Sequence, residues 1–332
     1  MTFSIIIPIY NASPYIIRSV NSVLSQNYDD FELILINDGS SDDSEKICLS
    51  LQNQYPAKIK YYYKENGGAA SARNFGVNHA IGDFLLFLDS DDYWIGQSGL
   101  ENVEKEILLS NNIDLLLLGA ETENSNNGSV RVRVNFSELE IDTFRSSDKL
   151  TNLCYLIATN KFPSSAWSVV INRRFMLESN ISFKEGIVAE DIDWIIECFY
   201  NNCKISAVSG VLYHYHEQRS GSVTNTAGEK TVESLYWIAA KWYERLLDDN
   251  TVKSNFLLKF LSFHYSTIFL ALGKLRMEKR KQYLARIEEF NGLLNFSIGK
   301  KSKIVNAIIR LFGITYGSKI LATSYSIFLK VK

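Results

Sequence analysis

The apolar positions along the first part of the chain alternate between two periods. Four short and nearly continuous apolar runs are typical of strands buried on both faces: Phe3 to Ile9, Phe31 to Ile36, Ile59 to Tyr63 and Phe84 to Leu88. Between the first two runs, apolar residues recur at helical spacing from Ile16 to Leu24. Strands and helices that alternate with short links predict right-handed crossovers and a parallel sheet.

Past the fourth run the pattern becomes mixed. A helix is predicted from Gln97 to Ser110 and a further buried strand from Ile113 to Leu118. Apolar and polar residues alternate from Val130 to Phe136, which indicates a half-exposed antiparallel strand. A last strand is predicted from Val208 to Tyr215, and helical patterns dominate from Glu233. The sequence therefore predicts an α/β fold with a mixed, mostly parallel sheet flanked by helices.

The composition is that of an ordinary globular protein. With 46% apolar residues and a net charge of −2, the chain has no marked affinity for polyanions, and a nucleic acid is not an expected partner. Its 332 residues suffice for two domains, and we place the α/β domain in residues 1–225 and a helical region in residues 226–332. The four cysteines show no C-x-x-C pairing, which favours buried, reduced thiols and a cytosolic setting. Met1 leads directly into a predicted strand, without the features of an export signal.

Three carboxylates follow the fourth apolar run, at Asp89, Asp91 and Asp92. Ligands of open α/β sheets bind beyond the carboxyl ends of the strands, so these acids are expected at the rim of a site. Acids this close repel one another unless a cation neutralises them, and their oxygens suit Mg²⁺ or Mn²⁺. The alternative interpretation is that the Asp and Ser residues here cap a following helix.

The turn after the third apolar run is rich in small residues. Asn66, Gly67 and Gly68 precede a small-residue helix that carries Arg73, and glycines there let the backbone approach a phosphate at the helix N-terminus. Neither G-x-G-x-x-G nor G-x-x-x-x-G-K-[ST] occurs, so the dinucleotide-fold and P-loop signals are absent. Asp38, after the second run, suits either a contact to a base or ribose or a turn residue. A nucleotide diphosphate with a divalent cation would use all of these elements.

Four motifs, in this order and spacing, resemble those of family-2 glycosyltransferases of the GT-A fold: Pro8-Ile9-Tyr10-Asn11, Asn37-Asp38-Gly39-Ser40, Asn66-Gly67-Gly68 through Ala72-Arg73-Asn74, and Asp89-Ser90-Asp91-Asp92. Members of that family are inverting transferases that use nucleotide-sugar donors, frequently in bacterial surface-polysaccharide synthesis. The resemblance covers the first two thirds of the chain and implies a GT-A, Rossmann-like fold there.

The resemblance also implies roles for single residues. Those assigned to the pocket for base and ribose are Pro8, Tyr10, Asn11 and Asp38. Those assigned to the rest of the nucleotide are Asn66, Gly67, Arg73 and Ser90. Asp89 and Asp91 would form the D-x-D motif, with Asp89 contacting ribose and metal and Asp91 contacting the metal directly.

A second acidic pair, Glu190-Asp191, begins an amphipathic helical pattern. A sugar transfer with inversion needs a base to take the proton of the attacking hydroxyl. The pair resembles the family's E-D element, whose aspartate is that base, so Asp191 is the predicted catalytic base with Glu190 beside it. The alternative is that both acids merely stabilise the first turn of a helix, by about 0.3–1 kcal/mol through its dipole.

A loop that closes over the donor is predicted after Tyr213. The stretch from Tyr213 to His216 resembles the family's Y-x-Y-(H/R) element, with His216 as a metal ligand. Arg219 and Ser222 offer donors for the diphosphate. The alternative is a tyrosine ladder that ends in a polar hairpin. Trp167 either borders the acceptor site, as a tryptophan near this place does in the family, or belongs to the core.

Two C-terminal segments are apolar enough to be considered as membrane-spanning or membrane-binding helices. Phe256 to Gly273 carries Lys259 and His264, which favours a packed or interfacial helix over a bilayer span. No acidic residue follows Glu289, whereas seven basic residues do. Because these are interleaved with apolar residues from Ile304 to Val331, they predict an amphipathic segment on anionic lipid. A helical cap on the catalytic domain or a dimer contact is the alternative.

We therefore expect an inverting glycosyltransferase that moves a sugar from a UDP-sugar to a hydroxyl of a glycan, carried on a polyprenyl lipid, in capsule, O-antigen or exopolysaccharide synthesis. The expected cofactor is Mg²⁺ or Mn²⁺, the expected place is the inner face of the cell membrane, and a homo-oligomer is compatible. A sugar-phosphate nucleotidyltransferase is disfavoured because no glycine-rich, basic turn follows the first strand. An inactive nucleotide-binding scaffold is disfavoured because Asp91 and Asp191 are present.

Overall fold

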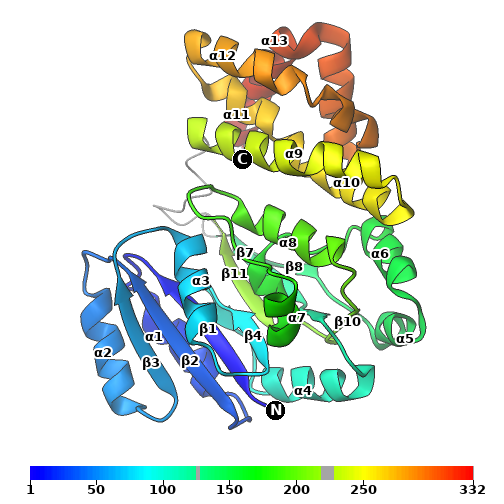
Figure 1. Ribbon diagram of the computed structural model, residues 1–332. Helices are drawn as coiled ribbons and strands as arrows, with labels where there is room; N and C mark the ends of the chain where they lie inside the picture. The colour runs from blue at the N-terminus through cyan, green and yellow to red at the C-terminus, as the bar shows by residue number, and fades with distance from the viewer. Residues whose placement is uncertain (125–127, 218–227, 332) are drawn as a thin grey trace. The chain divides into compact units, whose positions relative to one another are not determined.

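The computed structural model of the chain describes residues 1–124, 128–217 and 228–331, which form two compact units (Figure 1). The first, called here the sheet unit, comprises residues 1–186 and 197–220. The second, called the helical unit, comprises residues 187–196 and 221–332. The boundary predicted near residue 225 lies outside the described residues.

The described part of the sheet unit is built on a seven-stranded sheet with the order β10-β6-β9-β4-β1-β2-β3. The strands are β1 (Phe3–Ile9), β2 (Phe31–Asp38), β3 (Ile59–Lys64), β4 (Phe84–Phe87), β6 (Leu115–Leu117), β9 (Val169–Asn172) and β10 (Ile205–Ala207). β1 pairs in parallel with both β2 and β4, whereas β9 runs antiparallel to β4 and β6. The predicted mixed, mostly parallel sheet is confirmed, and the strand that leads to the acids lies at its centre.

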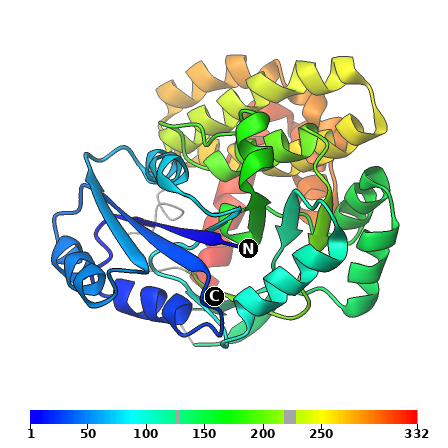
Figure 2. The same ribbon diagram turned by 60° about the horizontal axis from the view of Figure 1, so that its bottom comes forward.

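Helices cover both faces of this sheet. α1 (Ile16–Leu24), α2 (Ser44–Gln54) and α4 (Gly99–Ser110) share one apolar core with Ile5 and Ile7 of β1. α3 (Ala69–His79) packs on the opposite face, as the two views in Figures 1 and 2 show. Gly76 permits this close packing, because a Cβ there would lie 2.4 Å from Cγ2 of Ile6. Burial on both faces explains why these strands are apolar throughout.

Four further α-helices follow in the described part of this unit. They are α5 (Glu138–Ser146), α6 (Lys149–Ala158) and α7 (Arg173–Glu178), with α8 (Glu190–Tyr200) shared between the two units. α5 begins with a capping box in which Ser137 and Glu140 satisfy each other's backbone amides. Cys48, Cys198 and Cys203 are buried, and Cys154 is partly buried.

A second, four-stranded sheet in the described part of the sheet unit has the order β5-β11-β7-β8. Its strands are β5 (Tyr93–Trp94), β7 (Ala120–Asn124), β8 (Val130–Val134) and β11 (Tyr213–Glu217). β8 pairs antiparallel with β7, as predicted. The strand predicted from Val208 is wrong in its first half, since β11 begins only at Tyr213. The left-handed backbone of Gly210, with φ of 88°, interrupts the extended conformation there.

The helical unit contains α9 (Glu229–Asp249), α10 (Val252–Tyr265), α11 (Ile268–Lys274), α12 (Met277–Glu288) and α13 (Gly299–Val331). The single helix predicted from Phe256 to Gly273 is wrong, because a turn at Ser266 and Thr267 separates α10 from α11. Residues 252–274 and 302–321 are long and apolar enough to cross a bilayer, with 61% and 28% of them buried in the protein. That is weak evidence for a span, because buried core helices satisfy the same criteria.

α13 bends at Gly313, whose φ of 68° and ψ of 168° are not helical. On the side before the bend it leaves large apolar side chains in solvent, among them Leu311 at 78% and Phe312 at 52% exposure. Val305 and Ile309 on the same helix are buried. The helix therefore has one packed face and one apolar face that no described residue covers.

His264 in α10 makes the stability of the helical unit depend on pH. Burial lowers the pKa of this side chain to about 4, and its Nε2 has no hydrogen-bond partner among the described residues. The unfolded chain takes up a proton there below about pH 6.5, whereas the folded state stays neutral until about pH 4. The free energy of unfolding is therefore expected to fall by about 2–3 kcal/mol as the pH drops through this window. Denaturant titrations should show a smaller fall in His264→Phe, and an equal fall would contradict this account.

Candidate functional site

The polar ends of three parallel strands meet at one edge of the seven-stranded sheet. The register sets Ile9 of β1 beside Asn37 of β2, and Ile6 of β1 beside Phe87 of β4. The ends of these strands and the segments that follow them carry three of the four predicted motifs, and the remaining motif, Asn66-Gly67-Gly68 through Ala72-Arg73-Asn74, runs into the start of α3. The predicted common edge is therefore confirmed.

The loop after β1 is bonded to the loop after β2. The amide of Asn11 donates to Oγ of Ser40 at 3.0 Å, and the amide of Ser41 donates to Oδ1 of Asn11 at 2.8 Å. Asn11 adopts a left-handed φ of 48°, which asparagine tolerates better than most residues. Pro8 is partly buried at the end of the strand, and the ring of Tyr10 is exposed. Asn11 thus fixes the loop, and Tyr10 faces solvent.

Asp38 holds the glycine turn. Its Oδ1 accepts hydrogen bonds from Nζ of Lys64 at 2.6 Å and from the amide of Gly67 at 2.9 Å, and its Oδ2 accepts one from the amide of Gly68 at 2.7 Å. The side-chain amide of Asn66 donates to the Asp38 carbonyl at 2.9 Å. Gly68 has φ of 85°, a conformation that favours glycine. These contacts are those of the turn residue, one of the two roles left open for Asp38, and the nucleotide contact stays a prediction.

Arg73 of α3 bonds directly to the acid cluster. Its side chain is almost fully buried, and Nη2 donates to Oδ1 of Asp89 at 2.9 Å. The guanidinium also lies 5.5 Å from the ring centre of Phe183. The side chain of the next residue, Asn74, bonds the backbone of Phe183: its Nδ2 donates to the carbonyl at 2.8 Å, and its Oδ1 accepts from the amide at 2.9 Å. A buried, fixed cation therefore orients the first aspartate of the D-x-D motif.

Asp92 is the structural member of the acid cluster. It is 1% exposed, and its two oxygens accept hydrogen bonds from the hydroxyl of Tyr213 at 2.6 Å and from the amide of His216 at 2.8 Å. Burial raises the pKa of Asp92 well above its usual range, and the charges of Asp89 and Asp91 raise it further. The repulsion predicted between the three acids is thus present, and it favours a cation or a proton at this place.

The interpretation of the acids as a helix cap is wrong. β5 follows directly at Tyr93, and the next helix, α4, begins only at Gly99. Ser90 is buried, and Asp89 and Asp91 are partly exposed. Asp89 and Asp91 are therefore the members of the cluster within reach of a ligand.

The carboxylates of Asp89 and Asp91 fit a cation that is also coordinated by the substrate. Among the described residues, no three His, Cys, Asp or Glu side chains converge on a common cation site. His216, the third predicted ligand, has its ring Nδ1 3.5 Å from Oε2 of Glu123. Mg²⁺ is commonly held by one or two carboxylates together with substrate phosphates, so Asp89 and Asp91 suffice for such a site.

An aromatic stack supports the acid cluster from β11. The rings of Trp167 and Tyr213 are stacked at 4.3 Å, and those of Trp167 and Tyr215 at 5.7 Å. The guanidinium of Arg133 lies 5.6 Å from the Trp167 ring. Trp167 is buried, as expected of a core residue. Because Tyr213 carries the hydroxyl that bonds Asp92, the stack fixes the D-x-D loop.

Sequence reasoning missed a second set of contacts to this loop. Nη2 of Arg18 on α1 donates to the carbonyl of Asp91 at 2.8 Å, and its guanidinium lies 4.6 Å from the ring centre of Tyr93. Tyr93 in turn stacks on His214 at 4.3 Å, and Nδ1 of His214 lies 2.8 Å from a carboxylate oxygen of Glu121. No signal in the linear sequence connects these residues: Tyr93, His214 and Glu121 meet through sheet pairing, and Arg18 reaches the loop from α1.

Glu190 and Asp191 belong to the helical unit, at the start of α8 as predicted. Ala189, directly before them, has a left-handed φ of 63°. An alanine pays about 1–2 kcal/mol for this conformation, and strain of this kind concentrates at functional sites. Asp193, two residues after Asp191, is buried and bonded to Lys241 and Trp242 of α9. The predicted Arg219 and Ser222 lie outside the described residues.

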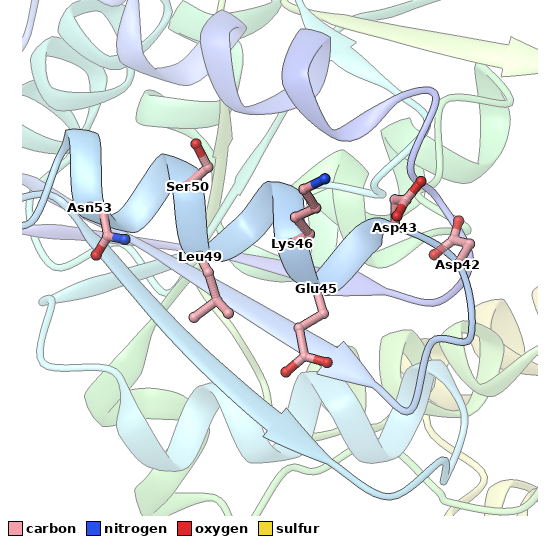
Figure 3. Close-up of a pocket in the computed structure, with 7 residues that line it drawn as sticks. All are labelled: Asp42, Asp43, Glu45, Lys46, Leu49, Ser50 and Asn53. Atoms are coloured by element: carbon pink, nitrogen blue, oxygen red, sulfur yellow. The ribbon is translucent and has the colours of Figure 1, made fainter.

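A surface pocket of about 550 Å³ lies along α2 (Figure 3). Its lining residues are Asp42, Asp43, Glu45, Lys46, Leu49, Ser50 and Asn53. Figure 3 shows Lys46 and Ser50 on one side of the helix and Glu45 and Leu49 on the other, so these side chains do not converge. Asp42 accepts hydrogen bonds from the amides of Ser13 and Ser44, both at 3.0 Å, and fixes the loops. We assign no ligand to this pocket.

Comparison with known sequences finds a family match in the N-terminal part. The family described as "Glycosyl transferase family 2" matches residues 4–129, which include all four predicted motifs. The minor teichoic acid biosynthesis protein GgaB of Bacillus subtilis (strain 168) is 30% identical over 226 residues, which are 66% of this chain and 23% of that protein. The chain therefore spans about a quarter of the length of this curated relative.

Comparison with solved structures identifies the fold. Residues 1–349 of S. aureus TarS, in complex with UDP-GlcNAc, align with a TM-score of 0.73 and 23% identity, covering 98% of this chain and 92% of that one. The mannosyltransferase PcManGT of Pyrobaculum calidifontis, in complex with GDP-Man and Mn²⁺, aligns with a TM-score of 0.54 and 13% identity, covering 99% and 87%. The predicted GT-A fold is confirmed by this likeness, which at such identities concerns the fold alone.

Proposed function

Because residues 4–129 belong to glycosyl transferase family 2, in a chain with the GT-A fold, we propose that this protein is an inverting glycosyltransferase. It moves a sugar from a UDP-sugar to a hydroxyl of a glycan. The observation that carries the proposal is the meeting at one sheet edge of the loops after β1 and β2, the turn that opens α3, and the carboxylates of Asp89 and Asp91. Nucleoside, diphosphate and cation each require one of these groups.

The nucleoside lies against the loops after β1 and β2. Pro8, Tyr10 and Asn11 border the base, and Asp38 borders the ribose. Tyr10 has an exposed ring available for stacking, and Asn11 and Asp38 are held in place by hydrogen bonds to neighbouring loops. Uridine is the preferred nucleoside because TarS, which shares the fold, binds UDP-GlcNAc.

Asp89 and Asp91 would hold Mg²⁺ or Mn²⁺ through their carboxylate oxygens. A bound divalent cation would neutralise the charge that develops on the leaving diphosphate. Arg73 keeps Asp89 oriented, and Arg18 keeps the carbonyl of Asp91 in place. Support comes from the pKa of Asp92, which burial raises and which the nearby charges of Asp89 and Asp91 raise further.

Asp191 is the general base. Its carboxylate takes the proton of the acceptor hydroxyl while that oxygen forms a bond to the anomeric carbon and the bond from this carbon to UDP breaks. A single displacement of this kind inverts the anomeric centre. The left-handed Ala189 directly before the Glu190-Asp191 pair supports a functional role, because a strained backbone persists only where its surroundings enforce it.

The acceptor is proposed to be a lipid-linked glycan of a cell-surface polymer. The relative GgaB is described as a teichoic acid biosynthesis protein, and that polymer class is the first to be tested. Purified protein should release UDP from one UDP-sugar of a donor panel in the presence of Mg²⁺ or Mn²⁺. Failure to bind or hydrolyse any nucleotide-sugar in the panel would refute the proposed function.

The exposed apolar face of α13 is proposed to dock on the cytoplasmic face of the membrane. Leu311 and Phe312 lie on this helix among basic residues, and no acidic residue follows Glu289. Apolar burial and about 1 kcal/mol per basic residue would hold the helix on anionic lipid. Full-length protein is expected to sediment with anionic liposomes, less so as salt rises, and to lose this binding when truncated before Lys300.

Truncation also removes Val305 and Ile309 of α13, which are buried, and can therefore affect folding. Substitution of exposed residues tests membrane docking without this loss. The double substitution Leu311→Ser with Phe312→Ser should also weaken liposome binding and leave activity on a short soluble acceptor unchanged. Leu139→Ser in the sheet unit is the matched control, since Leu139 is 78% exposed like Leu311. Equal liposome binding by all of these proteins would show that α13 is only a packing helix.

A further inference from the structure

A buried aspartate ties the proposed base to the C-terminal helices. Asp193 lies two residues after Asp191 and is 1% exposed. Nε1 of Trp242 donates to its Oδ1 at 2.7 Å, and Nζ of Lys241 lies 2.8 Å from Oδ1 and 3.1 Å from Oδ2. Both partners come from α9 and stand nearly fifty residues away in the sequence. A buried carboxylate needs such partners, because an unpaired charge in the interior is costly.

The same face of α9 makes a second contact on the other side of the pair. The amide of Val188 donates to Oγ of Ser234 at 3.0 Å, and this hydroxyl donates to the carbonyl of Lys230 at 2.7 Å. Ser234 lies seven and eight residues before Lys241 and Trp242, the spacing of one face of a helix. α9 is therefore hydrogen-bonded to this segment at two places, Val188 and Asp193.

The strained residue and the acidic pair lie between these two contacts. Ala189, with its left-handed φ of 63°, follows the first contact directly, and Glu190 and Asp191 follow Ala189. A backbone in this conformation relaxes when its surroundings no longer enforce it. Hydrogen bonds from α9 on both sides of Ala189, at Val188 and at Asp193, enforce its left-handed conformation in this way.

We propose that Ser234, Lys241 and Trp242 are positioning residues for the general base, which act through Val188 and Asp193 and touch no substrate. This inference rests on the proposed role of Asp191. The residues proposed to bind the nucleotide-sugar lie in the sheet unit and take no part in these hydrogen bonds. Loss of a contact therefore reorients the Asp191 carboxylate and leaves the nucleotide site as it was. The helical unit is in this respect a part of the catalytic machinery.

The test separates turnover from donor binding. Trp242→Phe keeps the ring and removes the Nε1 donor, and Lys241→Met keeps most of the side-chain volume and removes the charge. Each is expected to lower kcat about 10- to 100-fold, the loss that a small misplacement of a catalytic group causes, with KM for the donor within about twofold. Lys241→Arg, which keeps the positive charge and can still donate hydrogen bonds to the Asp193 carboxylate, should keep most of the kcat.

Two controls tell positioning from general destabilisation. Tyr283→Phe removes hydrogen bonds to Glu229 and Glu233, which join α12 to α9 away from Asp193. Lys230→Met removes an exposed lysine of α9 whose carbonyl contact remains. Both are expected to keep the wild-type kcat. A decrease in kcat with Tyr283→Phe as large as that with Trp242→Phe would overturn the inference.

Hydrogen exchange gives a readout that does not depend on turnover. The amides of residues 188–192 should exchange faster in Trp242→Phe and Lys241→Met than in wild-type protein, and not in the Tyr283→Phe control. If Asp191→Asn abolishes turnover while Trp242→Phe and Lys241→Met leave both kcat and exchange unchanged, the positioning role is refuted and the proposed function stands. If Asp191→Asn itself leaves turnover intact, the proposed base fails, and this inference fails with it.

Discussion

Replacing Asp191 with asparagine is expected to lower turnover by about 10²–10⁴-fold, the contribution of a positioned general base. Asparagine keeps the size of the side chain and most of its hydrogen bonding, but it cannot take a proton from the acceptor hydroxyl. Donor binding should survive, because the groups that bind nucleotide belong to the sheet unit. The measurement pairs kcat for sugar transfer with the dissociation constant for UDP from calorimetry.

Glu197→Gln is the matched control for this substitution. Glu197 lies on the same helix, α8, and the change removes one carboxylate in the same way. Turnover of this variant should remain within about threefold of wild type. A loss of less than about tenfold in Asp191→Asn would place the protein below the range of a general base and would remove that role from Asp191.

Replacing Asp91 with alanine is expected to abolish the part of UDP binding that depends on Mg²⁺ or Mn²⁺. The two carboxylates of Asp89 and Asp91 are the protein ligands that the site offers, and Asp89 is already paired with Arg73. With Asp91 gone, one shared carboxylate remains for the cation. Wild-type protein treated with a chelator should bind UDP as weakly as the variant does. Calorimetric titrations with and without the cation measure both effects.

Asp43→Ala serves as the control, since Asp43 is an exposed acid near the same sheet edge whose side chain makes no cap hydrogen bond. Its affinity for UDP should be that of wild type at every cation concentration. The thermal stability of Asp91→Ala should stay close to that of wild type, because its partly exposed side chain is not part of the core. Undiminished, cation-dependent affinity in Asp91→Ala would contradict the metal assignment.

The strands could be predicted because their signal is local. β1, β2 and β4 are apolar over their whole lengths, as strands buried on both faces must be, and polar clusters mark where they end. The place of the acids followed from the same pattern, since parallel strands end at a common edge. Prediction failed where the local signal was ambiguous. The same apolar pattern is expected for one long helix and for two short ones, so the turn at Ser266 and Thr267 was missed.

The partners of the site residues could not be predicted, because they come from distant parts of the chain. Tyr213 bonds Asp92 across 121 residues, and Trp242 bonds Asp193 across 49. Asp38 shows a different limit. Its carboxylate is engaged by Lys64 and by two glycine amides, a role that its motif does not distinguish from a nucleotide contact. A motif identifies the residue, but the contacts of that residue depend on the tertiary structure.

The anomeric configuration of the transfer product tests the central proposal most directly. The purified protein is supplied with its UDP-sugar donor, the cation and a short soluble acceptor, and the product is examined by nuclear magnetic resonance. A single displacement assisted by Asp191 predicts an anomeric bond of the opposite configuration to that in the donor. A product that retains the donor's configuration would contradict both the inverting mechanism and the role of Asp191 as its base.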